Sequence, residues 1–200
     1  ILILIFFFTG ASASEKKLEK RFDGRESVEI ETVSGDFIIR THDSDEILVE
    51  ITYDSRLEEV VEFKFKEHSR SLSMEEDWNG SGSGAIEWLI ILPEETDVDF
   101  STASGDFTIS GLKGELEGSA ASGDGVIERL SGSVEISVAS GDLEVRECDG
   151  EIDLSTASGD IHIEDCSGEI EMSTASGDIE GSGLDSDEIE LSAASGDIEI

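Results

Sequence analysis

Acidic side chains recur at a fixed spacing through the second half of this 200-residue chain. They follow the glycine of a repeated pattern, Ser-x-Ala-Ser-Gly-Asp, whose six glycines are 18, 18, 18, 18 and 19 residues apart. Columns of carboxylates supply hard oxygen ligands, the type that Ca²⁺ prefers. The candidate metal ligands are the turn residues Asp106, Asp124, Asp142, Asp160, Asp178 and Asp197 and the strand residues Glu117, Glu135, Asp153 and Glu171.

Two interpretations of these carboxylates stay open. A known calcium-binding β-roll repeats Gly-Gly-x-Gly-x-Asp with a nine-residue period. Half of the present repeat is also nine residues long, because a second turn glycine follows each of four repeats, at Gly114, Gly132, Gly150 and Gly168. Each half has one glycine where the calcium repeat has three. We therefore expect mainly a solvated acidic face without a cofactor, and Ca²⁺ binding is the alternative.

Catalytic chemistry is not expected from the other reactive side chains. The three histidines, His42, His68 and His162, are scattered, and their spacing suggests no Ser-His-Asp or Cys-His arrangement. The repeated Ser and Asp residues occur in every repeat, whereas a catalytic site breaks the symmetry of a repeat. Since paired carboxylates can hydrolyse glycosidic bonds, a carbohydrate-active β-helix enzyme is kept as a second alternative.

The elements that position these residues are short strands. Apolar and polar residues alternate on both sides of each Ser-Gly-Asp step, as in Ile161 and Ile163 after Gly159. Alternation with a period of two is typical of strands with one buried face, and a fixed longer period indicates stacked coils. We therefore predict an all-β, single-chain β-solenoid with two strands and two turns per 18-residue coil over residues 96–200. Its coils stack about 4.8 Å apart.

The first part of the chain is strand-rich but irregular. Residues 26–95 contain an early Ser-Gly-Asp turn at Gly35, and the 70 residues from Gly35 to Gly105 are not a multiple of 18. Because an open terminal coil exposes a bare strand edge, we predict longer coils or a capping sheet here. Pro93, the only proline, closes the last of these strands. Residues 14–25 are predicted to be a linker.

The two ends of the chain indicate a fragment of an exported protein. Residues 1–8 are an unbroken apolar run, followed by an Ala-x-Ala pattern that ends at Ala13. This is typical of the end of a secretory signal peptide, and the run is shorter than the roughly 20 residues of a membrane span. We expect residues 1–13 to be a signal peptide remnant and the mature chain to be periplasmic, on the cell surface or extracellular. Because the last coil stops at Ile200, we expect either further coils or a C-terminal cap after it, or end-to-end self-association.

The net charge of −36, from 49 acidic and 13 basic residues, limits the partners. Repulsion excludes nucleic acid and disfavours an anionic membrane surface. The outward positions of the first strand of each coil form two mostly acidic columns, and a serine column from Ser101 to Ser192 lies beside them. We expect this acidic, hydroxyl-rich face to meet a protein or a glycan at the cell envelope.

The cysteines, Trp78 and the repeat threonines suggest further possible roles. Cys148 and Cys166 occupy one column in adjacent coils, either as buried free thiols or as a disulfide, which export would permit. Trp78, in a Gly/Ser-rich segment, is a candidate for stacking on a sugar ring. An ice-binding threonine face is disfavoured because strand parity directs three repeat threonines inward, namely Thr102, Thr156 and Thr174.

The layout resembles a known family. An apolar leader precedes an early strand pair with the Ser34-Gly35-Asp36 turn, an irregular strand region, a Leu-Pro step at Pro93 and repeated Ser-Gly-Asp-Ile-x-Ile coils. Over about residues 26–200 this is similar to the putative-adhesin family of exported bacterial β-solenoid proteins, a domain of unknown function close to the head-domain adhesins. The resemblance implies an envelope or surface protein with a binding or adhesive role and no catalytic motif. We therefore predict a non-enzymatic, exported interaction scaffold.

Overall fold

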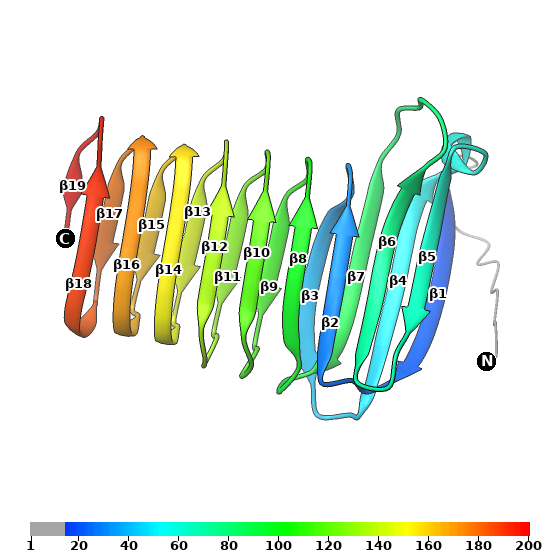
Figure 1. The fold of residues 1–200 in the computed structure, drawn as a ribbon, viewed down its shortest axis with the longest axis horizontal. Helices are drawn as coiled ribbons and strands as arrows, with labels where there is room; N and C mark the ends of the chain where they lie inside the picture. Colours follow the sequence, from blue (N-terminus) through cyan, green and yellow to red (C-terminus); the bar gives the residue numbers. More distant parts are fainter. Residues whose placement is uncertain (1–14) are drawn as a thin grey trace.

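The computed structural model describes residues 15–200, so the predicted signal peptide remnant lies outside the described residues. The described chain folds into two β-sheets that face each other and are joined by turns at both edges (Figure 1). Apart from the strands, the regular structure of this part is one short 3₁₀ helix, η1 (Ser55–Leu57). Within residues 15–200 no helix is long and apolar enough to cross a membrane. The prediction of an all-β solenoid is confirmed.

Each regular coil contributes one strand to each sheet. The ten strands of sheet A are, in spatial order, β1 (Glu15–Asp23), β4 (Glu46–Asp54), β7 (Ile86–Pro93), β3 (Asp36–His42), β9 (Phe107–Ser110), β11 (Gly125–Glu128), β13 (Leu143–Arg146), β15 (Ile161–Glu164), β17 (Ile179–Ser182) and β19 (Ile198–Glu199). The nine strands of sheet B are, in spatial order, β18 (Asp185–Ala193), β16 (Ser167–Ser176), β14 (Asp149–Ser158), β12 (Val134–Val138), β10 (Leu116–Ala120), β8 (Asp97–Thr102), β2 (Ser27–Thr32), β6 (Ser71–Trp78) and β5 (Val61–Glu67).

The regular coils stack in parallel with an offset of one sequence repeat. In sheet B, Glu117 lies beside Asp99 on one strand and beside Glu135 on the other, which is the register expected from the 18-residue period. The extra residue of the last, 19-residue spacing is absorbed as an irregularity between Ser167 and Glu169, where β16 pairs with β18. Every column of the sequence repeat is therefore a ladder of side chains along the solenoid.

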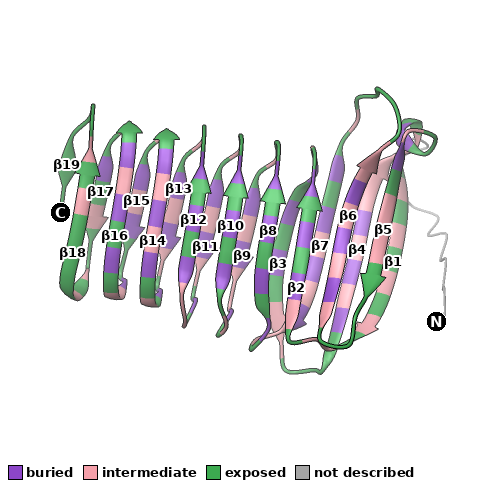
Figure 2. Cartoon of the chain, in the orientation of Figure 1, coloured by how far each residue is buried: buried purple, intermediate pink, exposed green. Residues whose placement is uncertain are grey.

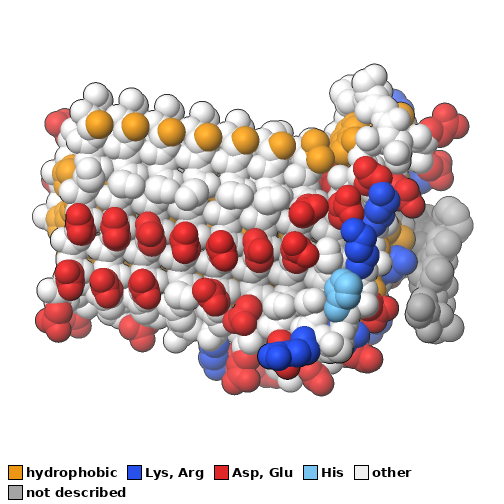
Figure 3. All heavy atoms as spheres, viewed as in Figure 1, with side chains coloured by type: hydrophobic (Ala, Val, Ile, Leu, Met, Phe, Trp, Pro, Cys, Tyr) orange, Lys and Arg blue, Asp and Glu red, His pale blue; other side chains and the backbone are white. Residues whose placement is uncertain are grey.

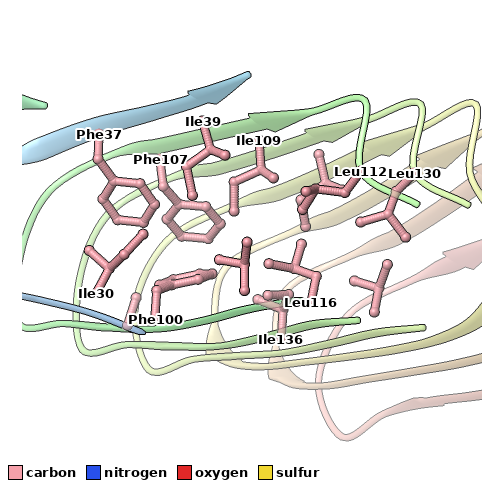
Figure 4. Close-up of a cluster of buried hydrophobic side chains, with 14 of the residues drawn as sticks. Ile30, Phe37, Ile39, Phe100, Phe107, Ile109, Leu112, Leu116, Leu130 and Ile136 are labelled. Carbon is pink, nitrogen blue, oxygen red and sulfur yellow. The ribbon is translucent and has the colours of Figure 1, made fainter. Parts of the chain in front are cut away.

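The core lies between the two sheets and consists of the alternate, inward-facing side chains (Figure 2). Near the cap, the rings of Phe37, Phe100 and Phe107 pack together, with centroid separations of 4.8–5.7 Å (Figure 4). A Cβ atom on Gly118 would lie 2.1 Å from the Phe100 ring, and one on Gly125 would lie 2.3 Å from the Phe107 ring. The two glycines thus leave the space that the two rings fill.

Antiparallel pairs build the irregular N-terminal cap. Strand β1 pairs with β4, β4 with β7, and β5 with β6. Strands β7 and β6 then continue in parallel into the coils through β3 and β2. The two edge strands, β1 and β5, carry several Lys and Glu residues, which discourage further strand pairing at these edges.

The linker prediction for residues 14–25 is wrong, because Glu15–Asp23 form strand β1. Leu18 and Phe22 pack against the core from this strand, and the Lys20 ammonium lies 5.1 Å from the centroid of the Phe65 ring. Lysines at the other inward positions interrupt the apolar alternation in the sequence. They are tolerated there because a lysine stem covers apolar surface while its ammonium stays in water.

Candidate interaction surface

The repeated glycines allow the coils to approach closely. The φ angle of Gly141 is 149°, and a Cβ atom on this residue would lie 2.0 Å from the carbonyl oxygen of Gly123, one coil earlier. The same contact recurs between the glycines of the following coils, at 1.9–2.0 Å. A side chain at this position would both clash with the backbone and strain it. The glycine of the motif is therefore a stacking residue.

The aspartate after each glycine ties its turn to the next coil. The backbone N–H of Asp124 donates to Oδ1 of Asp106 at 2.9 Å, and the N–H of Asp142 donates to Oδ1 of Asp124 at the same distance. Six consecutive hydrogen bonds of 2.8–2.9 Å join the aspartates in this way, from Asp36 to Asp197. One carboxylate oxygen of each accepting aspartate is thus engaged by the protein backbone.

The ten candidate metal ligands are divided between two places. The six turn aspartates form the ladder described above, whereas Glu117, Glu135, Asp153 and Glu171 form a separate ladder on the outer face of sheet B. In the part of the chain that the structure describes, no group of three or more His, Cys, Asp or Glu side chains is arranged to hold a metal ion. Calcium binding stays a prediction that a titration must test.

The outer face of sheet B carries four parallel ladders, which we call the ladder face (Figure 3). Acidic ladder 1 consists of Asp97, Glu115, Ser133, Glu151, Glu169 and Glu188. Acidic ladder 2 consists of Asp99, Glu117, Glu135, Asp153, Glu171 and Glu190. The serine ladder consists of Ser101, Ser119, Ser137, Ser155, Ser173 and Ser192. The alanine ladder consists of the exposed residues Ala103, Ala121, Ala139, Ala157, Ala175 and Ala194.

The adjacency of the acidic and serine columns was expected from strand parity, but the exposed alanine ladder was not. The signal was present in the motif, whose third residue is always alanine. This residue lies at the strand end, where the chain bends into the Ser-Gly turn. Because this alanine lies two residues after the outward serine, with a buried residue such as Thr102 between them, strand alternation extended by one step places it on the same outer face.

A shallow groove of about 1030 Å³ runs along the solenoid between the serine and alanine ladders. Its floor contains buried residues of the intervening column, including Ala120, Val138 and Thr156. The hydroxyl of Thr156 donates to the Gly141 carbonyl at 3.4 Å, as the Thr174 hydroxyl does to Gly159 at 3.2 Å. These threonines are buried, as strand parity predicted. The groove has hydroxyls on one wall and methyl groups on the other.

Comparisons with known proteins place the chain in a family. The Toastrack DUF4097 profile matches residues 25–200. The chain belongs to the Toastrack DUF4097 family. No significant match to this Toastrack chain is found among the curated proteins.

Three solved structures are similar to this Toastrack chain in fold. The first, a "putative cell adhesion protein" from Clostridium sporogenes, has a TM-score of 0.52 and 15% identity over 93% of this chain and 98% of that chain. The second, a "putative lipid binding protein" from Parabacteroides distasonis, has a TM-score of 0.46 and 16% identity over 94% and 97% of the two chains. The third, a "putative adhesin" from Bacteroides fragilis, has a TM-score of 0.44 and 15% identity over 92% and 96%.

Within residues 15–200, the acidic ladders of this Toastrack chain have no counter-charges in ion-pair contact. Among residues 15–200, no carboxylate of either acidic ladder forms a salt bridge. Ten of the 13 Lys and Arg residues precede Pro93, and none follows Arg146. Two carboxylates about 5 Å apart repel by roughly 0.8 kcal/mol at the dielectric constant of water. The ladder face therefore carries a negative potential that attracts cations.

The two cysteines of this Toastrack chain are buried free thiols in the structure. The Cys148 N–H donates to Cys166 Sγ at 3.3 Å, and the Cys148 thiol donates to the carbonyl of Arg146 at 3.2 Å. The hydrogen bond with Cys166 and burial raise the pKa of the Cys148 thiol. A thiol with a raised pKa is a poor nucleophile, which applies to Cys148. Burial of both side chains makes the pair part of the apolar column.

The other candidates from the sequence do not assemble into a site. Trp78 ends strand β6, packs against the core and donates its indole N–H to Glu76, so it is not a freely exposed platform for a sugar. His42 contacts the backbone carbonyl of Glu46, and His162 lies 3.5 Å from Glu180. His68 lies elsewhere, at the turn before β6, where its backbone pairs with Ser71.

Proposed function

We propose that this protein is a non-enzymatic, exported scaffold at the bacterial cell surface, and that its ladder face binds an extended partner. The observation that carries the proposal is the ladder face itself. Over six coils it repeats the same carboxylate, hydroxyl and methyl groups in register, and none of its carboxylates has a basic partner within the described chain. A partner that repeats along its own length can make equivalent contacts on every coil.

The chemistry of the face favours a positively charged, linear partner. Acidic ladders 1 and 2 attract amines, and they lie beside the groove that the serine and alanine ladders line. Serine hydroxyls can donate and accept hydrogen bonds, while alanine methyls pack against apolar edges. An amine-bearing glycan or a Lys/Arg-rich extended protein segment combines these groups.

The surface location rests on two supports. The apolar leader at residues 1–13 has the pattern of a secretory signal. The Clostridium sporogenes structure with a TM-score of 0.52 is described as a putative cell adhesion protein. A binding role also agrees with the scattered histidines, since catalysis needs a convergent acid, base or nucleophile.

Biolayer interferometry with poly-L-lysine, chitosan oligomers and neutral dextran tests the proposal. We expect the first two probes to bind at physiological salt and dextran not to bind. The ladder variant E117Q/E135Q/E171Q removes three charges from acidic ladder 2, and we expect it to weaken binding about tenfold or more. The matched control E87Q/E164Q/E180Q removes three charges from the outer face of sheet A.

The two variants have equal net charge, so they separate the ladder from the field of the whole molecule. A selective loss in the ladder variant supports the proposal. Equal losses in both variants would mean diffuse attraction to an acidic protein. Equal losses, or no binding of either cationic probe, would overturn the assignment of the ladder face as the binding surface.

A further inference from the structure

The outer face of sheet A near the cap is unlike the rest of the surface. Cross-strand neighbours form a continuous outward row across four strands, which reads Arg21, Leu48, Ile91 and Arg40. An apolar pair is thus flanked by two arginines in a chain whose formal net charge is −36.

A second row lies directly beside the first. Here Glu50 on β4 pairs with Leu89 on β7, which in turn pairs with Ile38 on β3. Ile38 is 37% exposed, and Leu48, Leu89 and Ile91 are half-buried on the side of the sheet that faces away from the core. We call Ile38, Leu48, Leu89, Ile91, Arg40 and Glu50 the cap patch. Contiguous apolar side chains with a polar rim on a sheet face are typical of a protein contact surface.

Arg40, in the cap patch, and Arg21, beside it, form no salt bridge with another residue of the described chain. Of the 13 Lys and Arg residues, all of which the structure describes, only Lys20, Arg21 and Arg40 form no salt bridge. Lys20 lies over the Phe65 ring. The chain has 49 acidic residues, yet Arg21 and Arg40 are exposed in one row and neither has a carboxylate partner among the described residues. This surface is therefore complementary to an acidic group on another molecule.

We propose that the cap patch is a two-fold interface between two copies of this chain. Arg40 and Glu50 occupy opposite corners of the apolar quartet, because they lie on the two strands that flank β7 and in different rows. In a two-fold interface, residue i contacts residue j of the second copy, and j contacts i. One arrangement therefore forms two Arg40–Glu50 pairs at once and buries the apolar quartets against each other.

The distribution of charge permits this contact. The cap contains ten of the 13 basic residues, whereas the coils after Arg146 contain none. The ladder face belongs to sheet B, on the opposite side of the molecule from the patch. Repulsion between distant exposed carboxylates is screened beyond about 8 Å at physiological salt.

Both ladder faces stay accessible in such a dimer, so it would present them as a bivalent surface. The dimer does not depend on what the ladder face binds.

Sedimentation velocity on the full chain over a concentration series tests the interface. We expect a reversible dimer in the wild-type protein, with a Kd in the range of small interfaces, about micromolar or weaker. R40E and E50R each place like charges at both corners, and we expect each to raise the dimer Kd about tenfold or more. The double variant R40E/E50R restores opposite charges, so we expect it to return the Kd toward the wild-type value.

The control is R70E, which changes the net charge as R40E does but lies away from the patch and should leave the Kd unchanged. Glu50 also pairs with Lys17 at 2.8 Å, so E50R removes an ion pair within the chain. Circular dichroism therefore checks that each variant stays folded. L89N, which changes no charge at the centre of the patch, tests the apolar contact independently and should also weaken the dimer. A monomeric wild type, or self-association insensitive to Arg40, Glu50 and Leu89, would overturn the proposal; the latter would place any contact elsewhere, including end to end.

Discussion

The backbone N–H of Asp160 donates a 2.8 Å hydrogen bond to Oδ1 of Asp142, one coil earlier in the solenoid. Because the same bond recurs at every coil, the most regular acidic column of the chain has a structural role. A carboxylate is suited to this position because it accepts from a turn N–H that the sheet ladders do not reach.

The variant D142A should therefore destabilise the protein by about 1–2 kcal/mol, since it leaves the Asp160 N–H without its acceptor. The variant D142N should lose less, because its amide oxygen can still accept the bond. Urea denaturation monitored by circular dichroism measures both. The matched control is D153A, which removes a carboxylate from acidic ladder 2, where no such backbone bond forms. If D153A cost as much as D142A, the hydrogen bond would not be the cause.

Three non-glycine residues at the second turn have a left-handed backbone, namely Arg129, Glu147 and Asp165, each with φ of 53°. Gly111 and Gly183 occupy the same column in other coils, with φ of 86° and 65°. Replacing Glu147 by glycine should relieve roughly 1–2 kcal/mol of strain, offset by about 0.5–1 kcal/mol of chain entropy.

We expect E147G to raise the free energy of unfolding by about 0.5–1 kcal/mol. The control E144G places glycine in the extended strand β13 and should lower the stability instead. Thermal unfolding of E147G, E144G and the wild type measures both changes in stability. A loss of stability in E147G would show that the Glu147 side chain contributes more than its backbone strain costs.

Packing of Phe107 over Gly125 gives a third prediction. The variant G125A should destabilise the core by about 1–3 kcal/mol, because its Cβ would meet the Phe107 ring at 2.3 Å. The variant F107L should also destabilise the protein, since it leaves a cavity. In the double variant, the smaller leucine makes room for the added methyl, so the double loss should be smaller than the sum of the single losses. A purely additive cycle would contradict the direct contact.

The acidic ladders predict a dependence of stability on ions. Since like charges lie side by side on neighbouring strands, salt should raise Tm by screening their repulsion. Calcium and magnesium chloride at equal concentration should act alike, because the turn aspartates already engage one oxygen with the backbone. Differential scanning fluorimetry in EDTA, CaCl₂, MgCl₂ and NaCl measures this. A saturable rise with Ca²⁺ alone would instead support ion binding by the ladders.

Much of the regular solenoid follows from the sequence because neighbouring coils differ by a simple translation. When every coil repeats after 18 residues, a column in the sequence becomes a ladder in space, as with Glu117 and Glu135. The buried threonines and the outward acidic columns of the repeat follow from the same alternation of strand residues.

The tertiary structure decided what the repeat does not encode. The antiparallel pairing of β1 with β4 joins segments across an irregular cap, and charged residues conceal the alternation of β1. The row of Leu48, Ile91 and Arg40 forms because β7, distant in sequence, lies in the sheet between β4 and β3, which are consecutive in the chain. The role of each turn aspartate depends on a single N–H in the next coil, and the reach of a side chain to that atom is a property of the stacked turns. Sequence periodicity alone therefore determined the coil and which residues lie on each of its faces. Pairing between residues distant in sequence determined the cap, the cap patch and the hydrogen-bonding role of each turn aspartate.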